Sequence, residues 1–177
     1  MQLDKFLITS QKFYDNIDAN ILYAHTCGVS KIYLREFEES RFYKCLEVCK
    51  GFGILLFVHY IDKYKQCILE SPCGIHLKGG ELSTLSLIPS KKITSYSAHS
   101  LNDVREAYTR GVDCIFLSPV FFVENKPVPL GIEYFYHIPD EYKDRIYALG
   151  GIDSSNIDMF YDTKIRGIAG IRMFLKD

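Results

Sequence analysis

The feature that most constrains this chain is the alternation of short apolar runs with segments of helical composition along 177 residues. Eight runs have the length and the β-branched or aromatic content of buried strands. They are residues 5–9, 31–35, 54–58, 74–77, 92–97, 113–117, 145–149 and 166–171. Parallel strands need crossover connections, and eight strand–helix units that close on themselves form a barrel. We therefore predict a (β/α)8 TIM barrel, with a flat doubly wound sheet as the alternative.

The length of the chain limits how complete such a barrel can be. Barrels of this kind rarely have fewer than about 200 residues. Helices are predicted over 14–27 and 38–50, but residues 79–89 are polar and short, and six residues follow the last run. No linker rich in Ser, Gly or Pro divides the chain. We expect one trimmed barrel domain over residues 1–177, with short or missing helices after the fourth and eighth strands.

Charge and hydropathy exclude several classes of partner. The 21 Lys and Arg residues against 22 Asp and Glu residues give a net charge of -1, which provides no basic field for nucleic acid or an anionic membrane. The longest apolar stretch, residues 53–60, is far shorter than the ~18 residues of a membrane span, and the first residues carry no secretion signal. We expect a cytoplasmic protein without nucleic-acid or membrane partners, which could form a homo-oligomer.

The six cysteines are interpreted as reduced thiols. No C-x-x-C pair occurs, and a chain of this length without a secretion signal is not typical of a disulfide scaffold. Cys45 and Cys49 share one face of a predicted helix. Without nearby histidines, two thiols make a poor zinc site, so we expect them to pack as small apolar side chains.

Polar residues gather where the predicted strands end, which is where the active site of a barrel lies. Cations, hydroxyls and bare backbone would meet there. The residues concerned are Arg35, His59, Asp62, residues 78–81, residues 97–100, Ser118, Gly150 and Gly151.

The paired glycines Gly150 and Gly151 are the most informative of these positions. Glycines let backbone N–H groups approach a ligand closely, and Asp153 or Ser154 could cap a following helix, whose N-terminus favours an anion. A phosphate cradle is favoured, and the alternative is a tight turn that needs glycine only for its backbone conformation.

Six strings of residues, in order and near the family spacing, resemble thiamine phosphate synthases and TenI-like proteins. They are residues 74–77 (GIHL), 97–101 (SAHSL), 111–113 (GVD), 118–121 (SPVF), Lys126 with 131–133 (GIE), and 148–152 (ALGGI). Residues 1–60 match more loosely, through FLIT at 6–9 and LRE at 34–36. Each string is weak alone, whereas six in register are a specific resemblance.

The resemblance implies a barrel that joins hydroxymethylpyrimidine pyrophosphate to thiazole phosphate and releases pyrophosphate. In that chemistry a pyrimidine cation forms as pyrophosphate leaves, so cations and hydroxyls around the leaving group favour the transition state. By resemblance, Arg35, Ser97 and Lys126 would be catalytic, and the phosphorylated substrates would contact a further set: His99, Ser118, Asn125, Gly150, Gly151 and Arg172. A structural role is the alternative for His99 and for His76, because lone histidines beside strand ends are more often structural.

The resemblance also implies Mg²⁺, held by carboxylates after the third and fourth strands. An ungapped count back from Gly74 places Asp62 at the first metal position, whereas alignment of the apolar run places His59 there. Glu81 occupies the second position, and a pair of carboxylates with phosphate oxygens is a typical Mg²⁺ site. We favour Asp62 with Glu81 and keep His59, or a solvated surface pair, as alternatives.

Several departures from the family pattern keep two other functions open. Tyr33 and Phe37 stand where the synthase has an amide and a cation, and Val123 and Asn125 stand where it has hydroxyls. These losses would suit a non-catalytic protein that binds phosphate ligands. The other alternative is a TenI-like thiazole tautomerase, but Pro119 occupies the position of its catalytic histidine.

Overall fold

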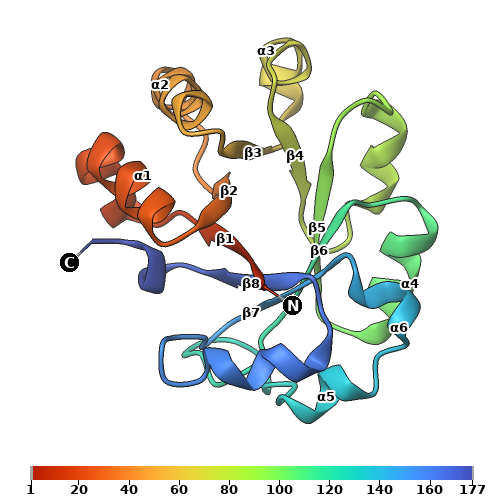
Figure 1. Ribbon diagram of the computed structural model, residues 1–177. Helices are drawn as coiled ribbons and strands as arrows, with labels where there is room; N and C mark the ends of the chain where they lie inside the picture. Colours follow the sequence, from red (N-terminus) through yellow and green to blue (C-terminus); the bar gives the residue numbers. More distant parts are fainter. Residues whose placement is uncertain (1, 177) are drawn as a thin grey trace.

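The computed structural model describes residues 2–176 and shows a closed barrel of eight parallel strands in chain order (Figure 1). β8 closes the barrel by pairing with β1, with Asp4 opposite Gly167 and Leu7 opposite Gly170. The predicted (β/α)8 barrel is therefore confirmed, and the flat sheet is wrong. The strands are β1 Asp4–Ile8, β2 Val29–Leu34, β3 Leu55–His59, β4 Gly74–Leu77, β5 Thr94–Ala98, β6 Cys114–Leu117, β7 Ile146–Leu149 and β8 Gly167–Gly170.

The helices around the barrel are uneven in length. The α-helices are α1 Ile17–Thr26, α2 Glu39–Gly51, α3 Lys65–Glu70, α4 Leu101–Thr109, α5 Glu133–Tyr136 and α6 Asp140–Lys143. The 3-10 helices are η1 Gln11–Asn16, η2 Asp62–Tyr64, η3 Leu82–Leu87, η4 Ile157–Thr163 and η5 Arg172–Phe174. The connection after β4 holds only η3, and within residues 171–176 β8 is followed by the 3-10 helix η5, so the short helices expected after these strands are confirmed. The connection after β7 is reduced in the same way, to η4.

The first helix differs from its prediction over residues 14–27. Its opening residues form η1, and α1 begins at Ile17, where the Asn16 side chain accepts a hydrogen bond of 3.1 Å from the Ala19 N–H. An asparagine that satisfies an otherwise unpaired N–H is a common start of an α-helix. The helix therefore starts at its cap rather than at the first apolar residue.

The barrel interior is filled by aromatic side chains. The Phe6 ring lies 5.1 Å from that of Phe57, 4.7 Å from that of Phe116 and 5.6 Å from that of Tyr147, measured between centroids. Gly74 makes room for this cluster, because a Cβ at that position would lie 2.5 Å from the Phe57 ring. The barrel is thus a packed core, and a substrate can reach it only from an end.

Ionic contacts join four strands at the end where the strands begin. One carboxylate oxygen of Asp4 accepts hydrogen bonds from Arg166 Nε at 2.8 Å, Lys31 Nζ at 3.3 Å and the Tyr147 hydroxyl at 3.1 Å. Burial alone would raise the pKa of Asp4, but Arg166 and Lys31 outweigh it and lower that pKa. This end of the barrel is held together by paired charges.

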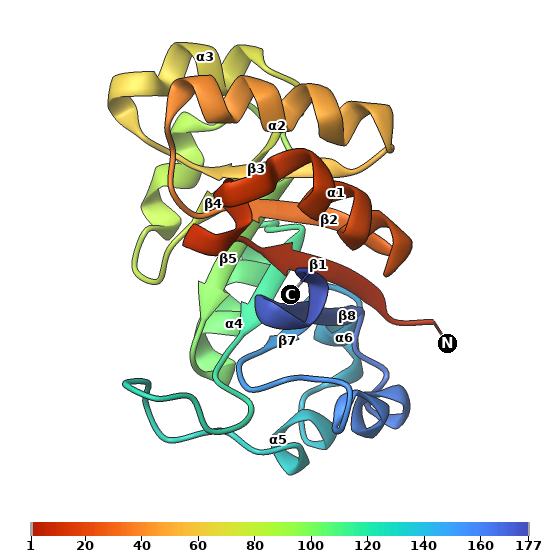
Figure 2. The same cartoon turned by 90° about the vertical axis from the view of Figure 1, so that its left-hand side faces the viewer.

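A loop protrudes at the opposite end, where the strands finish (Figure 2). It connects β6 to α5, and its stem is fixed by hydrogen bonds from Leu130 N–H to the Pro119 carbonyl and from Gly131 N–H to the Val120 carbonyl, both 2.9 Å. Residues 124–129 of the loop are all exposed. Among residues 2–176, no helix is both long and apolar enough to cross a membrane.

Candidate active site at the strand ends

A buried histidine, His76 on β4, lies at the centre of the strand-end region. Its Nδ1 is 2.9 Å from the Ser95 Oγ, and its Nε2 is 3.0 Å from the Ser97 Oγ. Ser95 and Ser97 are two apart on β5, so their side chains point to the same face of the strand. The chain thus brings the predicted catalytic Ser97 against an imidazole.

The environment of His76 keeps its ring neutral. The side chain is 2% exposed, and the rings of Tyr33 and Phe116 lie 4.1 Å and 5.4 Å from it. Burial, helped by the nearby charges of His59 and Lys78, lowers the pKa of His76 to about 3. His76 therefore carries one ring proton at neutral pH.

A second histidine, His59 at the end of β3, contacts Glu81. The His59 Nε2 lies 2.9 Å from the Glu81 Oε2, which also accepts a 2.8 Å hydrogen bond from the Lys78 N–H. Burial of Glu81 would raise the pKa of its carboxyl, but the Lys78 N–H and His59 together lower that pKa. Glu81 is thus held as a carboxylate at the mouth of the barrel.

The expected metal pair has separate partners in the structure. Asp62 is the first residue of η2, its side chain is 78% exposed, and its carboxylate lies 3.4 Å from Lys65 Nζ. β3 and β4 pair with His59 opposite His76, so His59, the other residue considered for the first metal position, stands beside Glu81 at the strand ends. No group of three or more His, Cys, Asp or Glu side chains is arranged to hold a metal within residues 2–176.

His99 and Ser118 meet between β5 and β6. The His99 Nδ1 lies 2.8 Å from the Ser118 carbonyl oxygen, and because a carbonyl only accepts, Nδ1 carries the proton. The His99 side chain is otherwise exposed. The bond from Ser118 to Pro119 is cis.

The paired glycines after β7 fit closely against the β6 loop. Gly150 has φ 103°, and a Cβ there would lie 2.9 Å from the Pro119 Cα. At Gly151, with φ 69°, a Cβ would lie 2.7 Å from the Phe121 Cβ. Glycine is needed here for both conformation and close approach, so the turn alternative accounts for the pair without any ligand.

The prediction that Asp153 or Ser154 caps a helix directly after these glycines is wrong. Asp153 Oδ1 accepts a 2.8 Å hydrogen bond from the Ser155 N–H, which forms a local turn, and the next helix is the 3-10 helix η4, which begins only at Ile157. Asp and Ser side chains compete for backbone N–H groups in this way. A phosphate at this turn would therefore have backbone N–H groups as ligands and no α-helix dipole.

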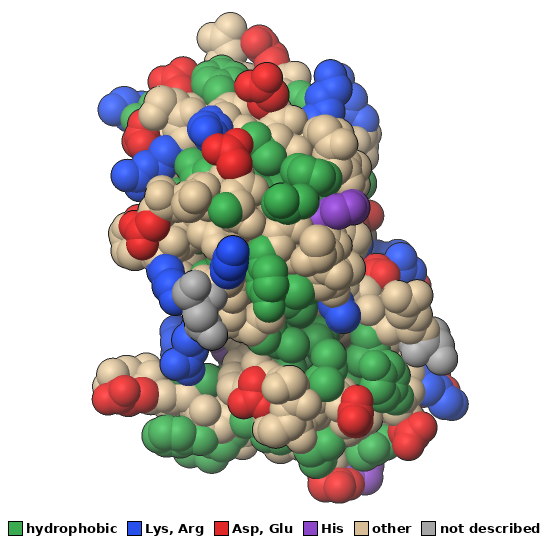
Figure 3. Space-filling view, turned by 60° about the vertical axis from the view of Figure 1, so that its left-hand side comes forward, with side chains coloured by type: hydrophobic (Ala, Val, Ile, Leu, Met, Phe, Trp, Pro, Cys, Tyr) green, Lys and Arg blue, Asp and Glu red, His purple; other side chains and the backbone are tan. Residues whose placement is uncertain are grey.

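The three predicted cationic contacts are exposed side chains around the mouth. Arg35 follows β2, and its N–H donates a 3.1 Å hydrogen bond to the Thr9 hydroxyl. Lys126 lies in the protruding loop beside Asn125, which has φ 59°, and Arg172 begins η5. Figure 3 shows Lys and Arg side chains along the margin above this loop, with a hollow between the loop and the body.

Two of the departures from the family pattern have a packing role. Tyr33 is 6% exposed and covers the His76 ring. Phe37 packs outside the barrel, with its ring 4.7 Å from that of Tyr64 and 5.3 Å from that of Phe42. The Tyr33 ring thus packs inside the barrel, and the Phe37 ring packs in the layer around it.

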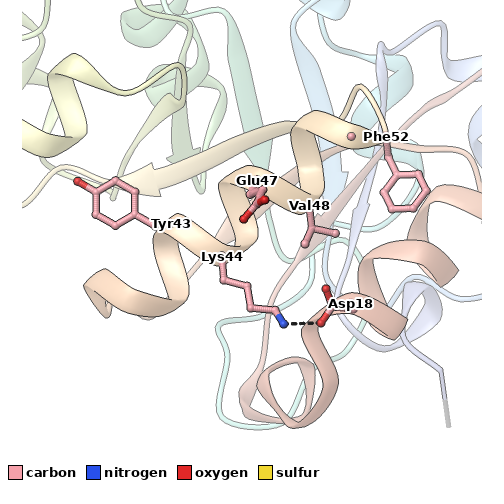
Figure 4. Close-up of a pocket in the computed structure, with 7 residues that line it drawn as sticks. Asp18, Tyr43, Lys44, Glu47, Val48 and Phe52 are labelled. Atoms are coloured by element: carbon pink, nitrogen blue, oxygen red, sulfur yellow. Dashed lines mark ion pairs between the residues drawn. The ribbon is translucent and has the colours of Figure 1, made fainter.

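Two surface hollows lie away from these residues. A groove of about 630 Å³ runs between α1 and α2 on the outside of the barrel, with Asp18 paired to Lys44 at its edge (Figure 4). A smaller one, of about 290 Å³, lies where β3 and β4 begin, beside Leu55 and Gly74. No candidate site residue lines either hollow.

Sequence reasoning missed Ser95 and undervalued His59. The available signal for Ser95 was its spacing of two from Ser97 on one strand, next to a strand that carries His76. For His59 the signal was its place directly after the apolar run of residues 54–58.

Known proteins with the same fold and sequence pattern identify the family. A family model described as thiamine monophosphate synthase matches residues 6–174. A putative thiamine-phosphate synthase 2 of Aquifex aeolicus is 30% identical over 159 residues, or 84% of each chain. A thiamine-phosphate synthase of Chlamydia abortus is 28% identical over 185 residues, or 96% of this chain and 86% of that one.

A solved structure shows the same fold. The thiamine phosphate pyrophosphorylase from Pyrococcus furiosus superposes with a TM-score of 0.74 at 19% identity, over 96% of this chain and 85% of that one. Since the family model covers residues 6–174, from within β1 to the end of η5, the chain belongs to the thiamine monophosphate synthase family.

Proposed function

We propose that this protein is a thiamine-phosphate synthase. The methylene carbon of hydroxymethylpyrimidine pyrophosphate would lose its bond to the pyrophosphate oxygen, and the electron pair would leave with pyrophosphate. The resulting pyrimidine cation would then form a bond to the nitrogen of thiazole phosphate. The observation that carries this proposal is the family match over residues 6–174, which includes every strand end of the barrel.

Each part of the mouth has a role in such a reaction. Arg35 and Lys126 would neutralise the leaving pyrophosphate, and the Ser97 hydroxyl would donate to one of its oxygens. The backbone at Gly150 and Gly151, with the Arg172 guanidinium, would bind the phosphate of the thiazole. His99 after β5, with Ser118 and Asn125 after β6, would contact these phosphorylated substrates.

Glu81 would hold Mg²⁺ in this site. This ion is usually held by one or two carboxylates, with phosphate oxygens and waters as its other ligands. Glu81 is kept ionised by its hydrogen bonds and lies where the strands end. Asp62, exposed and paired with Lys65, is the weaker candidate for a second carboxylate. When bound, the ion would neutralise charge on the leaving pyrophosphate.

The proposal also covers surroundings and partners. We propose small phosphorylated substrates in the cytoplasm, with no nucleic-acid or membrane partner. Light scattering of the purified protein would measure its mass in solution and so decide whether it forms a homo-oligomer. 

The direct test is to incubate the purified protein with both precursors and Mg²⁺ and to measure thiamine phosphate and pyrophosphate. Formation of both in equal amounts supports the synthase. Isomerisation of the thiazole phosphate alone would instead identify a tautomerase, whose base this chain lacks because Pro119 holds that position. Binding of pyrophosphate without turnover would identify a binding protein, the alternative favoured by Tyr33, Phe37 and Val123.

A further inference from the structure

A chain of three polar side chains crosses from the barrel interior to its mouth. It runs from Ser95 through His76 to Ser97, with 2.9 Å between Ser95 Oγ and Nδ1 and 3.0 Å between Nε2 and Ser97 Oγ. Ser95 is completely buried, whereas Ser97, two residues nearer to the end of β5, is half-buried. This row of three side chains therefore has one end, Ser95, in the core and the other end, Ser97, where a ligand can reach it.

The imidazole in the middle is fixed in place. Tyr33 and Phe116 lie against its ring at centroid distances of 4.1 Å and 5.4 Å, inclined by 38° and 37°. His76 is 2% exposed and both of its nitrogens have a hydroxyl partner. A ring that cannot turn and holds one proton has only two arrangements, which differ in the nitrogen that carries the proton.

The two arrangements give Ser97 opposite properties. With the proton on Nε2, the ring donates to the Ser97 oxygen, and the Ser97 hydrogen is free to point to the mouth. With the proton on Nδ1, the Ser97 hydroxyl donates to Nε2, and only oxygen lone pairs remain for a ligand. Only the first arrangement leaves Ser97 able to donate to an anion.

Burial of Ser95 favours the first arrangement. Among the described residues, the Ser95 hydroxyl has His76 Nδ1 as its only partner. If Nδ1 carried the proton, the Ser95 hydrogen would be buried without an acceptor, which is unfavourable. If Nδ1 is bare, Ser95 donates to it and this donor is satisfied.

We propose that Ser95 is a positioning residue that fixes His76 as the Nε2–H tautomer and thereby turns the Ser97 hydroxyl into a hydrogen-bond donor at the mouth. Ser95 itself touches no ligand. The consequence for the reaction rests on the proposed function, because it requires the leaving pyrophosphate to lie beside Ser97. The tautomer itself does not depend on that function.

The first experiment measures the tautomer directly in the ligand-free protein. Histidine labelled with ¹⁵N, in long-range ¹H–¹⁵N spectra at pH 7, shows which ring nitrogen carries the proton. The His76→Gln protein identifies which signals belong to His76. We expect Nε2 to be protonated in the parent, and we expect Ser95→Ala to give a mixture of both tautomers. A parent with protonated Nδ1, or a tautomer unchanged by Ser95→Ala, would overturn the proposal.

The second experiment measures the effect on Ser97. A hydrogen bond to a charged group contributes enough that its loss costs about tenfold or more. We expect Ser95→Ala to weaken pyrophosphate binding by up to about tenfold in calorimetry. We also expect it to lower kcat rather than raise KM. In a Ser97→Ala background the same change should have no further effect, because the hydroxyl that it positions is absent.

Cys114→Ala is the matched control. Cys114 pairs with Ser95 in the ladder between β5 and β6, is 5% exposed and lies in the barrel interior without a bond to His76. The Cys114→Ala substitution should leave the His76 tautomer and the pyrophosphate affinity unchanged. If Ser95→Ala and Cys114→Ala lose equal pyrophosphate affinity, Ser95 has only a packing role. The same follows if the losses of Ser95→Ala and Ser97→Ala add up in the double variant. A parent that shows the Nε2–H tautomer but no turnover refutes the synthase and leaves the tautomer assignment standing.

Discussion

Two histidines at the mouth show how the surroundings of a residue decide its chemistry. His76 lies between aromatic rings, and burial lowers its pKa to about 3, so its ring remains uncharged at neutral pH. His99 is exposed, and its Nδ1 donates to the Ser118 carbonyl. The same residue type thus lies buried between two hydroxyls in one place and anchors an exposed ring to a backbone carbonyl in the other.

Lys126 offers the clearest test of a single contact in the candidate site. Its side chain is exposed in the protruding loop, beside Asn125, whose positive φ bends the loop tip. If it contacts pyrophosphate, Lys126→Ala should cost about 1.5–3 kcal/mol of binding free energy, or roughly 10- to 150-fold in affinity. Isothermal titration calorimetry with pyrophosphate measures this loss.

Lys50→Ala is the control for that experiment. Lys50 is exposed in the last turn of α2, away from the strand ends. The Lys50→Ala substitution changes the net charge of the protein by the same amount as Lys126→Ala. The pyrophosphate affinity of this variant should stay within error of the parent. If Lys126→Ala behaves in the same way, Lys126 is a surface lysine and its role in the site is lost.

Individual site residues were only partly predictable from the sequence. The position of Ser97 at a strand end was evident, but its partner His76 and the buried Ser95 depend on the pairing register of β4 and β5. The contact of His59 with Glu81 likewise depends on the register of β3 and β4, and two residues separate the end of β3 from Asp62 at the start of η2. Register and loop length are properties of the assembled barrel, which local sequence does not contain.

At the scale of elements, strands were more predictable than helices. All eight strands lie within two residues of their predicted bounds, since a strand buried on both faces needs a continuous apolar run. The helical segments include η1, η3 and η4, whose 3-10 geometry was not predicted. Asn16, Asp153 and other short polar side chains compete for backbone N–H groups there, and their hydrogen bonds decide where a helix begins.

The closure of the barrel by β8 predicts a stability effect at the opposite end from the site. Asp4 on β1 joins Lys31 on β2, Tyr147 on β7 and Arg166 beside β8. Asp4→Asn removes the charge that these groups share. We expect it to lower the free energy of unfolding by about 1–2 kcal/mol at pH 7, since the pairs are only partly buried. Urea denaturation followed by circular dichroism measures the loss.

The pH dependence of this loss follows from the lowered pKa of Asp4. A carboxyl whose pKa is lower in the folded protein stabilises it above the unfolded value, near 3.8, and this stabilisation disappears as pH falls through the folded pKa. The difference between parent and Asp4→Asn should therefore be constant from pH 7 to about 5 and vanish in strong acid.

Asp18→Asn serves as the control for this pH series. Asp18 forms an exposed pair with Lys44, and exposed pairs contribute little. Its stability should lie within about 0.5 kcal/mol of the parent throughout. A difference for Asp4→Asn that persists unchanged in acid would assign the effect to altered packing instead of charge.

At the scale of the whole molecule, the two ends of the barrel differ in how their charges are arranged. The end where strands begin has its charges paired around Asp4, whereas the other end carries the exposed cations Arg35, Lys126 and Arg172. The alternation of strands and helices was enough to predict the closed barrel. The division of charge between its ends could not be read from a net charge of -1.

That near-zero net charge leads to a prediction about metal dependence. The proposed substrates are multiply anionic, and the molecule as a whole does not attract them. If Mg²⁺ is held by Glu81, pyrophosphate should bind more tightly as Mg²⁺ is added. Glu81→Gln should then remove most of this gain, about tenfold or more for one charged contact of ~1.4 kcal/mol. Calorimetric titrations with pyrophosphate, with and without Mg²⁺, give the two affinities for each protein.

Asp62→Asn separates the two metal assignments within the same experiment. The Asp62 side chain is 78% exposed and contacts Lys65, so its loss should leave both the fold and the Mg²⁺-dependent gain unchanged. If Asp62→Asn removes the gain as Glu81→Gln does, the loop at η2 moves to bring both carboxylates to one ion. If neither variant changes the gain, Mg²⁺ acts on pyrophosphate without a carboxylate of this protein, and the cations of the mouth alone bind the resulting complex.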